Sequence, residues 1–279
     1  MTIMLGNTPL LPVTAAINRL TVLLWGLSGC GKTVLASTMP GKKLWIQFDP
    51  DGVASVSDRT DVEVLDFSQA EHSVVENFNE RGVYEQLFDN MLKDRPDLET
   101  IVLDSATSYA EKALLYGITS GKADGKSKQG GVSFKATLGQ PGMAGYGFRN
   151  RYVLGIITML LRLTAKHKRN FVVVCHEGAA EKDNDGKPTS ITVLLGGSLP
   201  QEVPLQISEV WHVADTGHDR LIRIRPFGIR SPMRSRMFNM TGDGLIVWKY
   251  DQAKDEGMKI ATWYQQWRDG GFKKLPLPK

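Results

Sequence analysis

The feature that most constrains this chain is a Gly-rich turn that directly follows a continuous apolar segment. The apolar segment covers residues 19–25, and the turn reads Gly26-Leu27-Ser28-Gly29-Cys30-Gly31-Lys32-Thr33. An unbroken apolar run is typical of a strand buried on both faces of a sheet. Residues 33–39 then favour a helix, which Pro40-Gly41 would end. Since glycines let backbone N–H groups converge on an anion, this order predicts an α/β fold with a phosphate-binding loop.

Each residue type in the turn has a predicted task. Lys32 would reach the β- and γ-phosphates of a nucleoside triphosphate, and the Thr33 hydroxyl would ligate Mg²⁺. The N-terminus of the following helix presents its dipole to the same anion. We therefore predict that the ligand is ATP with Mg²⁺; the alternative is that the motif matches by chance. The residues predicted to bind the nucleotide are Gly26, Leu27, Ser28, Gly29, Cys30, Gly31, Lys32, Thr33 and Val34. Cys30 is interpreted as a small loop-filling side chain rather than a redox switch, because reactivity needs a depressed pKa.

The remaining apolar patterns predict strands alternating with helices. Strands are expected over 43–48, 62–67, 100–104 and 170–175, and helices over 83–92, 106–116 and 152–166. This alternation implies a doubly wound, mainly parallel sheet. Residues 209–214, 221–225 and 245–250 alternate instead, which predicts an antiparallel C-terminal extension.

The length of 279 residues suits one large α/β domain with small additions. We predict an N-terminal extension over 1–17, an ATPase core over 18–240 and a C-terminal appendage over 241–279. Glycine-rich, weakly periodic stretches predict mobile loops near 117–147 and 177–200.

The cysteine usage and the lack of a targeting or membrane-spanning pattern predict a cytoplasmic protein. Its two cysteines, Cys30 and Cys175, lie far apart in sequence, so a disulfide framework is not expected. Residues 1–17 lack the pattern of a signal peptide, and no apolar run is long enough to span a membrane. The formal charge of +4 permits contact with nucleic acid without requiring it.

Acidic residues follow two of the predicted strands. Asp104 ends the strand 100–104 and would hold the water shell of the metal; its alternative role is a helix N-cap, which Ser105 could equally fill. Asp49 and Asp51 follow the strand 43–48, at the carboxyl edge where ligands gather in such sheets. Either could orient the attacking water, or both could belong to an ordinary Asp-Pro-Asp-Gly turn.

His176 closes the strand 170–175 at the same predicted edge. This position would let its imidazole face the γ-phosphate as a sensor. A structural histidine is the alternative.

These elements together resemble the RecA-like P-loop ATPases, and more closely the phage-encoded ATP-binding proteins of that class, some of which are associated with recombination and single-strand annealing. The resemblance covers residues 18–240 and rests on residues 26–33, 48–52, 102–105, 173–176 and 209–211. In that class a Glu after the second strand activates water. Asp51 stands at the matching position here, and its shorter side chain implies slow hydrolysis. His176 would correspond to the polar group, often Gln, that ends the later strand.

The resemblance also implies partners. RecA-like proteins form rings or filaments, so a homo-oligomer is expected, and their DNA-facing loops would correspond to the two glycine-rich stretches. A phage protein would work in the cytoplasm of its host cell.

The first glycine-rich stretch has the composition of a single-stranded DNA contact. It carries Lys122, Lys126, Lys128 and Lys135 beside Phe134 and Tyr146. Basic residues next to aromatic ones suit single-stranded nucleic acid. A solvated flexible loop is the alternative.

Arginines gather in residues 220–236. The alternation over 220–225 is expected to place Arg220, Arg223 and Arg225 on one face of a strand, with a solvated sheet face as the alternative to a functional one. Arg234 or Arg236 would act in trans as an arginine finger on a neighbouring subunit.

Three functions follow from these features. The leading one is a DNA-associated RecA-like ATPase of phage recombination or replication. The second is an assembly or switch protein that binds ATP and scarcely hydrolyses it, as Asp51 in place of Glu suggests. The third is a small-molecule P-loop kinase, which would need an arginine-bearing lid helix that the sequence does not clearly contain.

Overall fold

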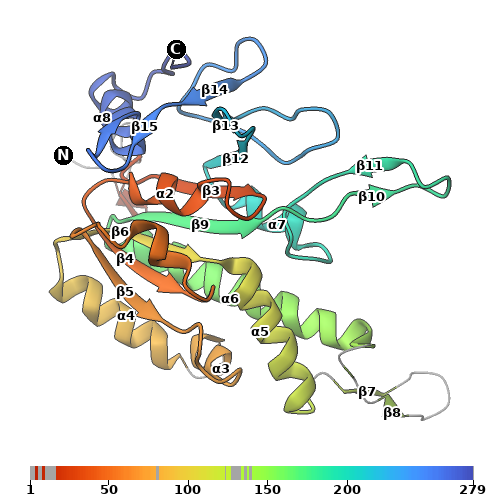
Figure 1. Cartoon of the computed structure of the whole chain (residues 1–279). Coiled ribbons are helices and arrows are strands. Elements are labelled where there is room, and N and C mark those ends of the chain that lie inside the picture. The colour runs from red at the N-terminus through yellow and green to blue at the C-terminus, as the bar shows by residue number, and fades with distance from the viewer. Residues whose placement is uncertain are drawn as a thin grey trace.

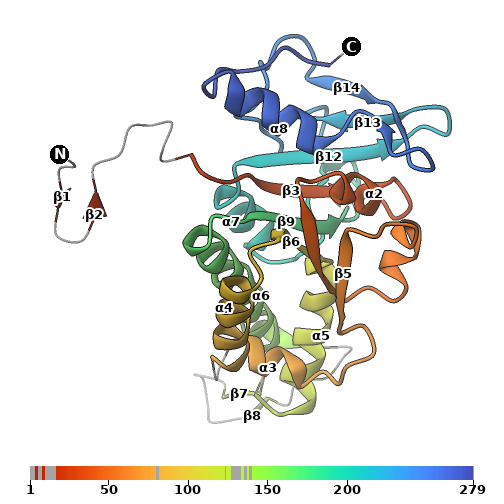
Figure 2. The same ribbon diagram turned by 90° about the vertical axis from the view of Figure 1, so that its left-hand side faces the viewer.

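An eight-stranded sheet forms the centre of the molecule, in the order β14-β13-β12-β3-β9-β6-β4-β5 (Figures 1 and 2). The computed structural model describes residues 4–5, 8–9, 17–79, 82–122, 124–126, 133–134, 137 and 140–278. The strands of the sheet are β3 (Thr21–Gly26), β4 (Lys42–Gln47), β5 (Val62–Asp66), β6 (Leu98–Asp104), β9 (Asn170–His176), β12 (Glu209–Asp215), β13 (Arg220–Arg223) and β14 (Leu245–Trp248). Strands β12 through β5 pair in parallel, whereas β13 and β14 add antiparallel pairs. The predicted α/β class with a mainly parallel sheet and an antiparallel C-terminal extension is confirmed.

The sheet order brings the ends of three strands together. Strand β9 lies between β3 and β6, with Gly26 opposite His176 and Asp104 opposite Val174. Since all these strands run in the same direction, their carboxyl ends share one edge of the sheet. This edge therefore collects the Gly-rich loop, Asp104 and His176.

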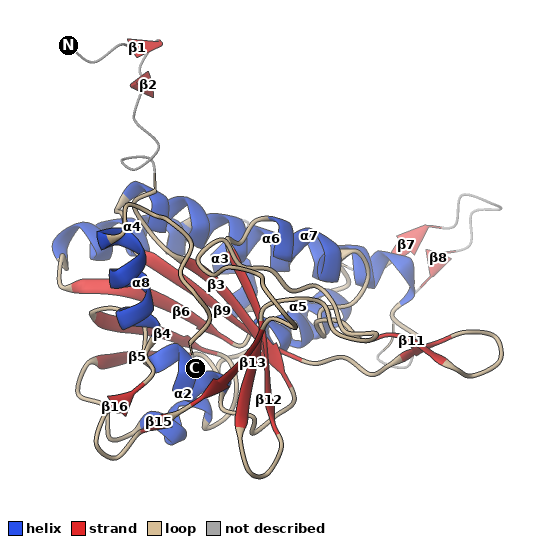
Figure 3. Ribbon diagram, turned by 90° about the horizontal axis from the view of Figure 1, so that it is seen from above, coloured by secondary structure: helices blue, strands red, loops and turns tan. Residues whose placement is uncertain are grey.

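Two apolar cores cover the two faces of the sheet. Side chains alternate along β3, so that Leu23 and Trp25 enter one core and Val22 and Leu24 enter the other. The first core includes side chains of α3 (Val74–Asn79), α4 (Val83–Asp94), α5 (Ala106–Thr119), α6 (Gly142–Lys166) and α7 (Leu199–Leu205), and the second those of α2 (Lys32–Ser37) and α8 (Ile260–Asp269). Figure 3 shows α6 and α2 on opposite sides of the sheet. Burial on both faces explains why these strands read as continuous apolar runs.

Several elements differ from the sequence-based expectation. Helix α6 begins at Gly142 rather than at residue 152, so part of the first predicted loop is helical. Its first turns are rich in Gly, Arg and Asn and lack apolar periodicity, yet Phe148 stacks on Tyr152 with ring centroids 4.2 Å apart. Tertiary packing of this kind stabilises a helix that the local pattern does not reveal.

The second predicted loop also contains regular structure. Strands β10 (Glu181–Lys182) and β11 (Pro188–Ser190) pair in an antiparallel hairpin, and α7 begins at Leu199. The sequence pattern missed α3, α7, α8 and the 3-10 helix η1 (Gly52–Val56).

Short two-stranded pairs complete the described secondary structure. They are β1 (Met4–Leu5) with β2 (Thr8–Pro9), β7 (Gly125–Lys126) with β8 (Ser133–Phe134), and β15 (Tyr250–Asp251) with β16 (Glu256–Gly257). In the part of the chain that the structure describes, no helix has both the length and the apolar character that crossing a bilayer requires.

Candidate functional site

The loop between β3 and α2 depends on its glycines. Gly29 and Gly31 have φ angles of 78° and 97°, in the left-handed region that side chains disfavour. Gly26 lies so close to β12 that an added Cβ would stand 2.0 Å from the backbone oxygen of Val213. The loop therefore curls tightly at the start of α2, as a phosphate-binding turn requires.

Lys32 places its ammonium group inside this loop. The Nζ atom donates to the backbone oxygens of Gly26 at 3.0 Å and Leu27 at 2.6 Å. The residue is buried, with 5% of its surface exposed. A buried cation held among backbone groups offers a strong contact to an incoming anion, because charge attraction grows where water is excluded.

Asp104 is joined to the loop by a hydrogen bond. The Thr33 hydroxyl donates to its Oδ2 at 3.1 Å, and the indole Nε1 of Trp45 donates to the same oxygen at 3.2 Å. Burial raises the pKa of Asp104 to about 6, assisted by the charge of Asp49 and opposed by the two hydrogen bonds and by Lys32. The alternative role as helix cap is taken by Ser105, whose hydroxyl accepts from the backbone N–H of Ser108 at 3.1 Å.

The pair Thr33 and Asp104 fits a magnesium ion. Mg²⁺ is usually held by one or two carboxylates, substrate phosphates and several waters rather than by a full protein cage. Among the described residues no group of three or more His, Cys, Asp and Glu side chains forms such a cage. A hydroxyl beside a buried carboxylate, next to a phosphate-binding loop, is the donor set that this mode of binding needs.

A second acid, Asp49, lies at the same edge and is fully engaged. Its Oδ2 contacts His176 Nε2 at 3.1 Å, and its Oδ1 accepts hydrogen bonds from Ser105 at 2.8 Å and from Ser108. Burial alone would raise the pKa of Asp49, but the hydrogen bonds from His176, Ser108 and Ser105 lower it below its usual value. Asp49 is therefore held as an anion that fixes the imidazole of His176.

These groups line one pocket of about 300 Å³. The predicted loop residues on its wall are Ser28, Gly29, Gly31, Lys32, Thr33 and Val34. Asp49, Asp104 and His176 line it as well, whereas Asp51 does not. Asp51 precedes η1 with a φ of 53°, and its role in orienting water stays a prediction.

Arg220 lines the same pocket, which the sequence pattern did not anticipate. The prediction that Arg220, Arg223 and Arg225 share one face of a strand is wrong. Residues 220 and 223 are an odd number apart, so the period of two places them on opposite faces. Arg223 lines a neighbouring cavity together with Leu221, and Arg225, past the end of β13, donates to backbone oxygens.

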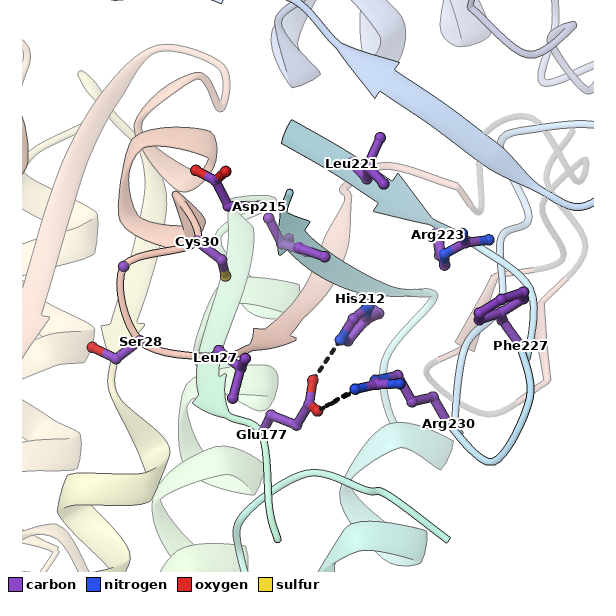
Figure 4. Close-up of a pocket in the computed structure, with 13 residues that line it drawn as sticks. Leu27, Ser28, Cys30, Glu177, His212, Asp215, Leu221, Arg223, Phe227 and Arg230 are labelled. Atoms are coloured by element: carbon purple, nitrogen blue, oxygen red, sulfur yellow. Dashed lines mark hydrogen bonds and ion pairs between the residues drawn. The ribbon is translucent and has the colours of Figure 1, made fainter. Parts of the chain in front are cut away.

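The neighbouring cavity, of about 510 Å³, lies against the other side of the loop, where Leu27 and Cys30 line it (Figure 4). Its buried Glu177 contacts His212 Nε2 at 2.6 Å and accepts from Arg230 Nη2 at 3.0 Å. Burial alone would raise the pKa of Glu177, but these two hydrogen bonds lower it. Burial lowers the pKa of His212. Glu177, which follows β9, therefore links His212 of β12 to Arg230, which lies in the segment after β13.

The two arginines predicted to act in trans lie away from both cavities. Arg234 donates to the backbone oxygens of Pro204 and Ile207, and Arg236 is exposed. Neither lines the pocket of Lys32. Their proposed roles on a neighbouring subunit stay predictions.

The predicted nucleic-acid lysines are only partly described. Lys122 pairs with Glu76 at 3.1 Å and lies 5.2 Å from the ring centroid of Tyr116. The backbone of Lys126 belongs to β7, while Lys128 and Lys135 lie outside the described residues. The structure thus places one of the four lysines in a contact within the chain.

The fold and the site define a class: an α/β protein with a P-loop after one strand of a mainly parallel sheet and a buried acid two strands away. The sequence model of a family described as "AAA domain" matches residues 18–237, and the chain belongs to this AAA domain family. No curated protein sequence gives a significant match.

Solved structures give two similarities of low sequence identity. The KaiC-like protein PH0186 from the hyperthermophilic archaeon Pyrococcus horikoshii OT3 is 13% identical with a TM-score of 0.41, covering 82% of this chain and 89% of that one. The RadB recombinase is 12% identical with a TM-score of 0.42, covering 86% of this chain and 91% of that one.

Proposed function

We propose that this protein binds ATP with Mg²⁺, hydrolyses it slowly and couples this cycle to single-stranded DNA in phage recombination or replication. The observation that supports binding of ATP with Mg²⁺ is the hydrogen bond of 3.1 Å between the Thr33 hydroxyl and Asp104, next to the buried ammonium of Lys32. Thr33, Asp104 and Lys32 line one pocket, and a hydroxyl beside a carboxylate next to a Gly-rich loop supports the binding of a metal nucleotide there.

The chain's own groups would hold the substrate as follows. Loop amides and Lys32 orient the β- and γ-phosphates, while Thr33 and Asp104 hold the metal and its waters. When bound, Mg²⁺ neutralises charge that develops on the phosphate oxygens. The protein therefore contributes mainly positioning and electrostatics, which dominate phosphoryl transfer.

His176 is the proposed group that orients the attacking water. Its Nε2 lies 3.1 Å from Asp49 Oδ2, so in the tautomer that carries the proton on Nε2 this N–H donates a hydrogen bond to the carboxylate and Nδ1 is left as an acceptor. An imidazole held by a second group in this way matches the general pattern of a base and its orienting partner. Asp51 remains the alternative for this role.

The test combines calorimetry with phosphate release. Wild type should bind Mg·ATP, and Lys32→Ala, Thr33→Ala and Asp104→Ala should lose binding. Lys93→Ala, an exposed lysine on α4, serves as the matched control and should bind as wild type does. A folded wild-type protein that gives no heat with Mg·ATP would reject the proposal.

A second candidate is a nucleotide-dependent switch that scarcely hydrolyses ATP. It is favoured by the state of Asp49, whose low pKa and three hydrogen bonds make this carboxylate a poor proton acceptor. Binding of Mg·ATP without phosphate release, together with ATP-dependent assembly in light scattering, would support the switch. Multiple turnovers that His176→Ala abolishes would favour hydrolysis instead.

DNA binding and oligomerisation belong to the same proposal. Fluorescence anisotropy with single-stranded oligonucleotides should show affinity that falls with salt. Replacing Lys122, Lys126, Lys128 and Lys135 together by Ala should lower the magnitude of the salt slope by up to about 3 if each contacts a phosphate. Unchanged binding would remove this loop from the proposal.

An arginine acting in trans can be tested by mixing variants. Arg236→Ala and Lys32→Ala should each be inactive alone. Mixed oligomers should regain part of the ATP turnover, because one interface then joins an intact Lys32 site to an intact Arg236. Full activity of Arg236→Ala alone would exclude that arginine.

A further inference from the structure

Arg220 reaches across the phosphate-binding loop from β13. Its Cδ and Nε atoms lie 3.4 Å from the point where a Cβ on Gly31 would stand. The residue lines the pocket of about 300 Å³ together with Lys32 and Thr33. A guanidinium group of the same chain therefore borders the predicted polyphosphate site.

Among the described residues, none accepts a hydrogen bond from the guanidinium group of Arg220. Its register partner across the β12–β13 hairpin is Asp215, with 3.8 Å between Arg220 Nε and Asp215 Oδ2. That distance is too long for a hydrogen bond. The guanidinium also lies 5.9 Å from the ring centroid of Trp248, a buried residue whose Nε1 is fixed by the backbone oxygen of Met258 at 2.9 Å. The fixed ring of Trp248 thus lies beside the guanidinium group of Arg220, while the ion pair of Arg220 with Asp215 is weak.

Lys32 and Arg220 stand at opposite ends of the loop. The Nζ atom of Lys32 lies against the backbone oxygens of Gly26 and Leu27, at the start of the loop. Arg220 lies beside Gly31, where α2 begins. In such loops the lysine reaches the β- and γ-phosphates, and the backbone amides cradle the α- and β-phosphates. The second cation is therefore placed toward the nucleoside side of the polyphosphate.

We propose that Arg220 binds the α/β-diphosphate part of the nucleotide in cis, from the same chain that supplies Lys32. The proposal rests on the proposed nucleotide binding and assigns a second cation to that site. The planar guanidinium can donate to two phosphate oxygens at once and would exchange its weak pair with Asp215 for them. ADP and ATP share the α/β-diphosphate, so Arg220 contributes equally to the affinity for both.

The test measures nucleotide affinity by calorimetry, with Mg·ADP and a non-hydrolysable Mg·ATP analogue. Arg220→Ala should weaken both ligands about tenfold, the scale of one lost hydrogen bond to a charged group at a half-exposed site, and Arg220→Lys should lose less. Asp215→Asn should tighten both, because it removes the acid that competes for Arg220. Arg223→Ala is the matched control, since it lies on the same strand but lines the neighbouring cavity, and its affinities should equal those of wild type.

Each outcome decides a separate question. Wild-type affinity in Arg220→Ala for both ligands, or weaker binding by Asp215→Asn, would overturn the role of Arg220 while nucleotide binding stands. A loss confined to the ATP analogue would place the contact at the γ-phosphate and also overturn the proposal. A folded wild type that binds neither ligand would reject the proposed function itself. Circular dichroism melts verify folding, and Asp215→Asn decides the question if Arg220→Ala does not fold.

Discussion

Replacing Asp104 by Asn should stabilise the nucleotide-free protein at neutral pH while removing its capacity to hold the metal. Asp104 is 2% exposed and accepts hydrogen bonds from Thr33 and Trp45 at 3.1 and 3.2 Å. Asparagine keeps an acceptor oxygen and nearly the same shape. The substitution therefore removes a buried charge without opening a cavity.

The magnitude follows from the pKa. Burial raises the pKa of Asp104 from 3.8 to about 6, and each unit corresponds to about 1.4 kcal/mol. The ionised carboxylate therefore costs the folded state up to about 3 kcal/mol at neutral pH. Because the folded pKa lies above the unfolded one, this cost is absent below about pH 4, grows as the pH rises toward 6 and is constant above that.

Urea denaturation in EDTA, from about pH 5 to about pH 7.5, measures the effect. The free energy of unfolding of Asp104→Asn minus that of wild type should increase with pH across this range. Asp94→Asn, an exposed acid on α4, is the matched control for the loss of one carboxylate. In a separate measurement without EDTA, Mg·ATP should stabilise wild type but not Asp104→Asn.

A difference that is the same at both ends of this pH range would refute the reasoning. So would an Asp104→Asn protein that is less stable than wild type at neutral pH. Either result would mean that the charge of Asp104 is compensated by its hydrogen bonds and by Lys32 despite its burial.

Three further predictions concern the packing and charges around the site. Gly26→Ala should lower the free energy of unfolding by about 3 kcal/mol or more and abolish nucleotide binding, because the new Cβ would collide with the backbone oxygen of Val213; thermal melts and calorimetry check it. Glu177→Ala should cost about 2–4 kcal/mol in urea denaturation, since the buried His212 and the partly exposed Arg230 lose their acceptor, whereas Glu177→Gln should cost less. Burial alone would raise the pKa of Asp61, but hydrogen bonds from Arg59 and Lys43 lower it to about 2. Its stabilisation should be present above about pH 4 and lost as the pH falls toward 2, so melts of Asp61→Asn and wild type should converge in acid.

The local sequence predicted those parts of the site that depend on neighbouring residues. The turn over 26–33 has the glycines that its backbone angles need, and the apolar run into Asp104 forms β6 as expected. Both signals are short-range. One is an apolar strand followed by a turn whose backbone angles favour glycine, and the other is an apolar strand that ends in an acid.

Residues that converge on the pocket from distant elements were not predicted in the same way. Trp45 meets Asp104 through pairing of β4 with β6, and Arg220 meets Gly31 through the β12–β13 hairpin. Asp49 lines the pocket and Asp51, the residue directly before η1, does not. A single sequence carries no signal for such contacts, because pairing partners and turn directions depend on the whole sheet.

By itself the sequence determined the class of fold, the phosphate-binding loop and the acid at the end of β6. Glycine backbone freedom and strand burial are local requirements, so a few adjacent residues suffice to specify them. Only the tertiary structure decided which carboxylate holds His176, which arginine borders the loop and how deeply Asp104 is buried. These properties depend on strand order and on the exclusion of water by distant segments, and burial of that kind sets the pKa values and ion pairs on which the chemistry would depend.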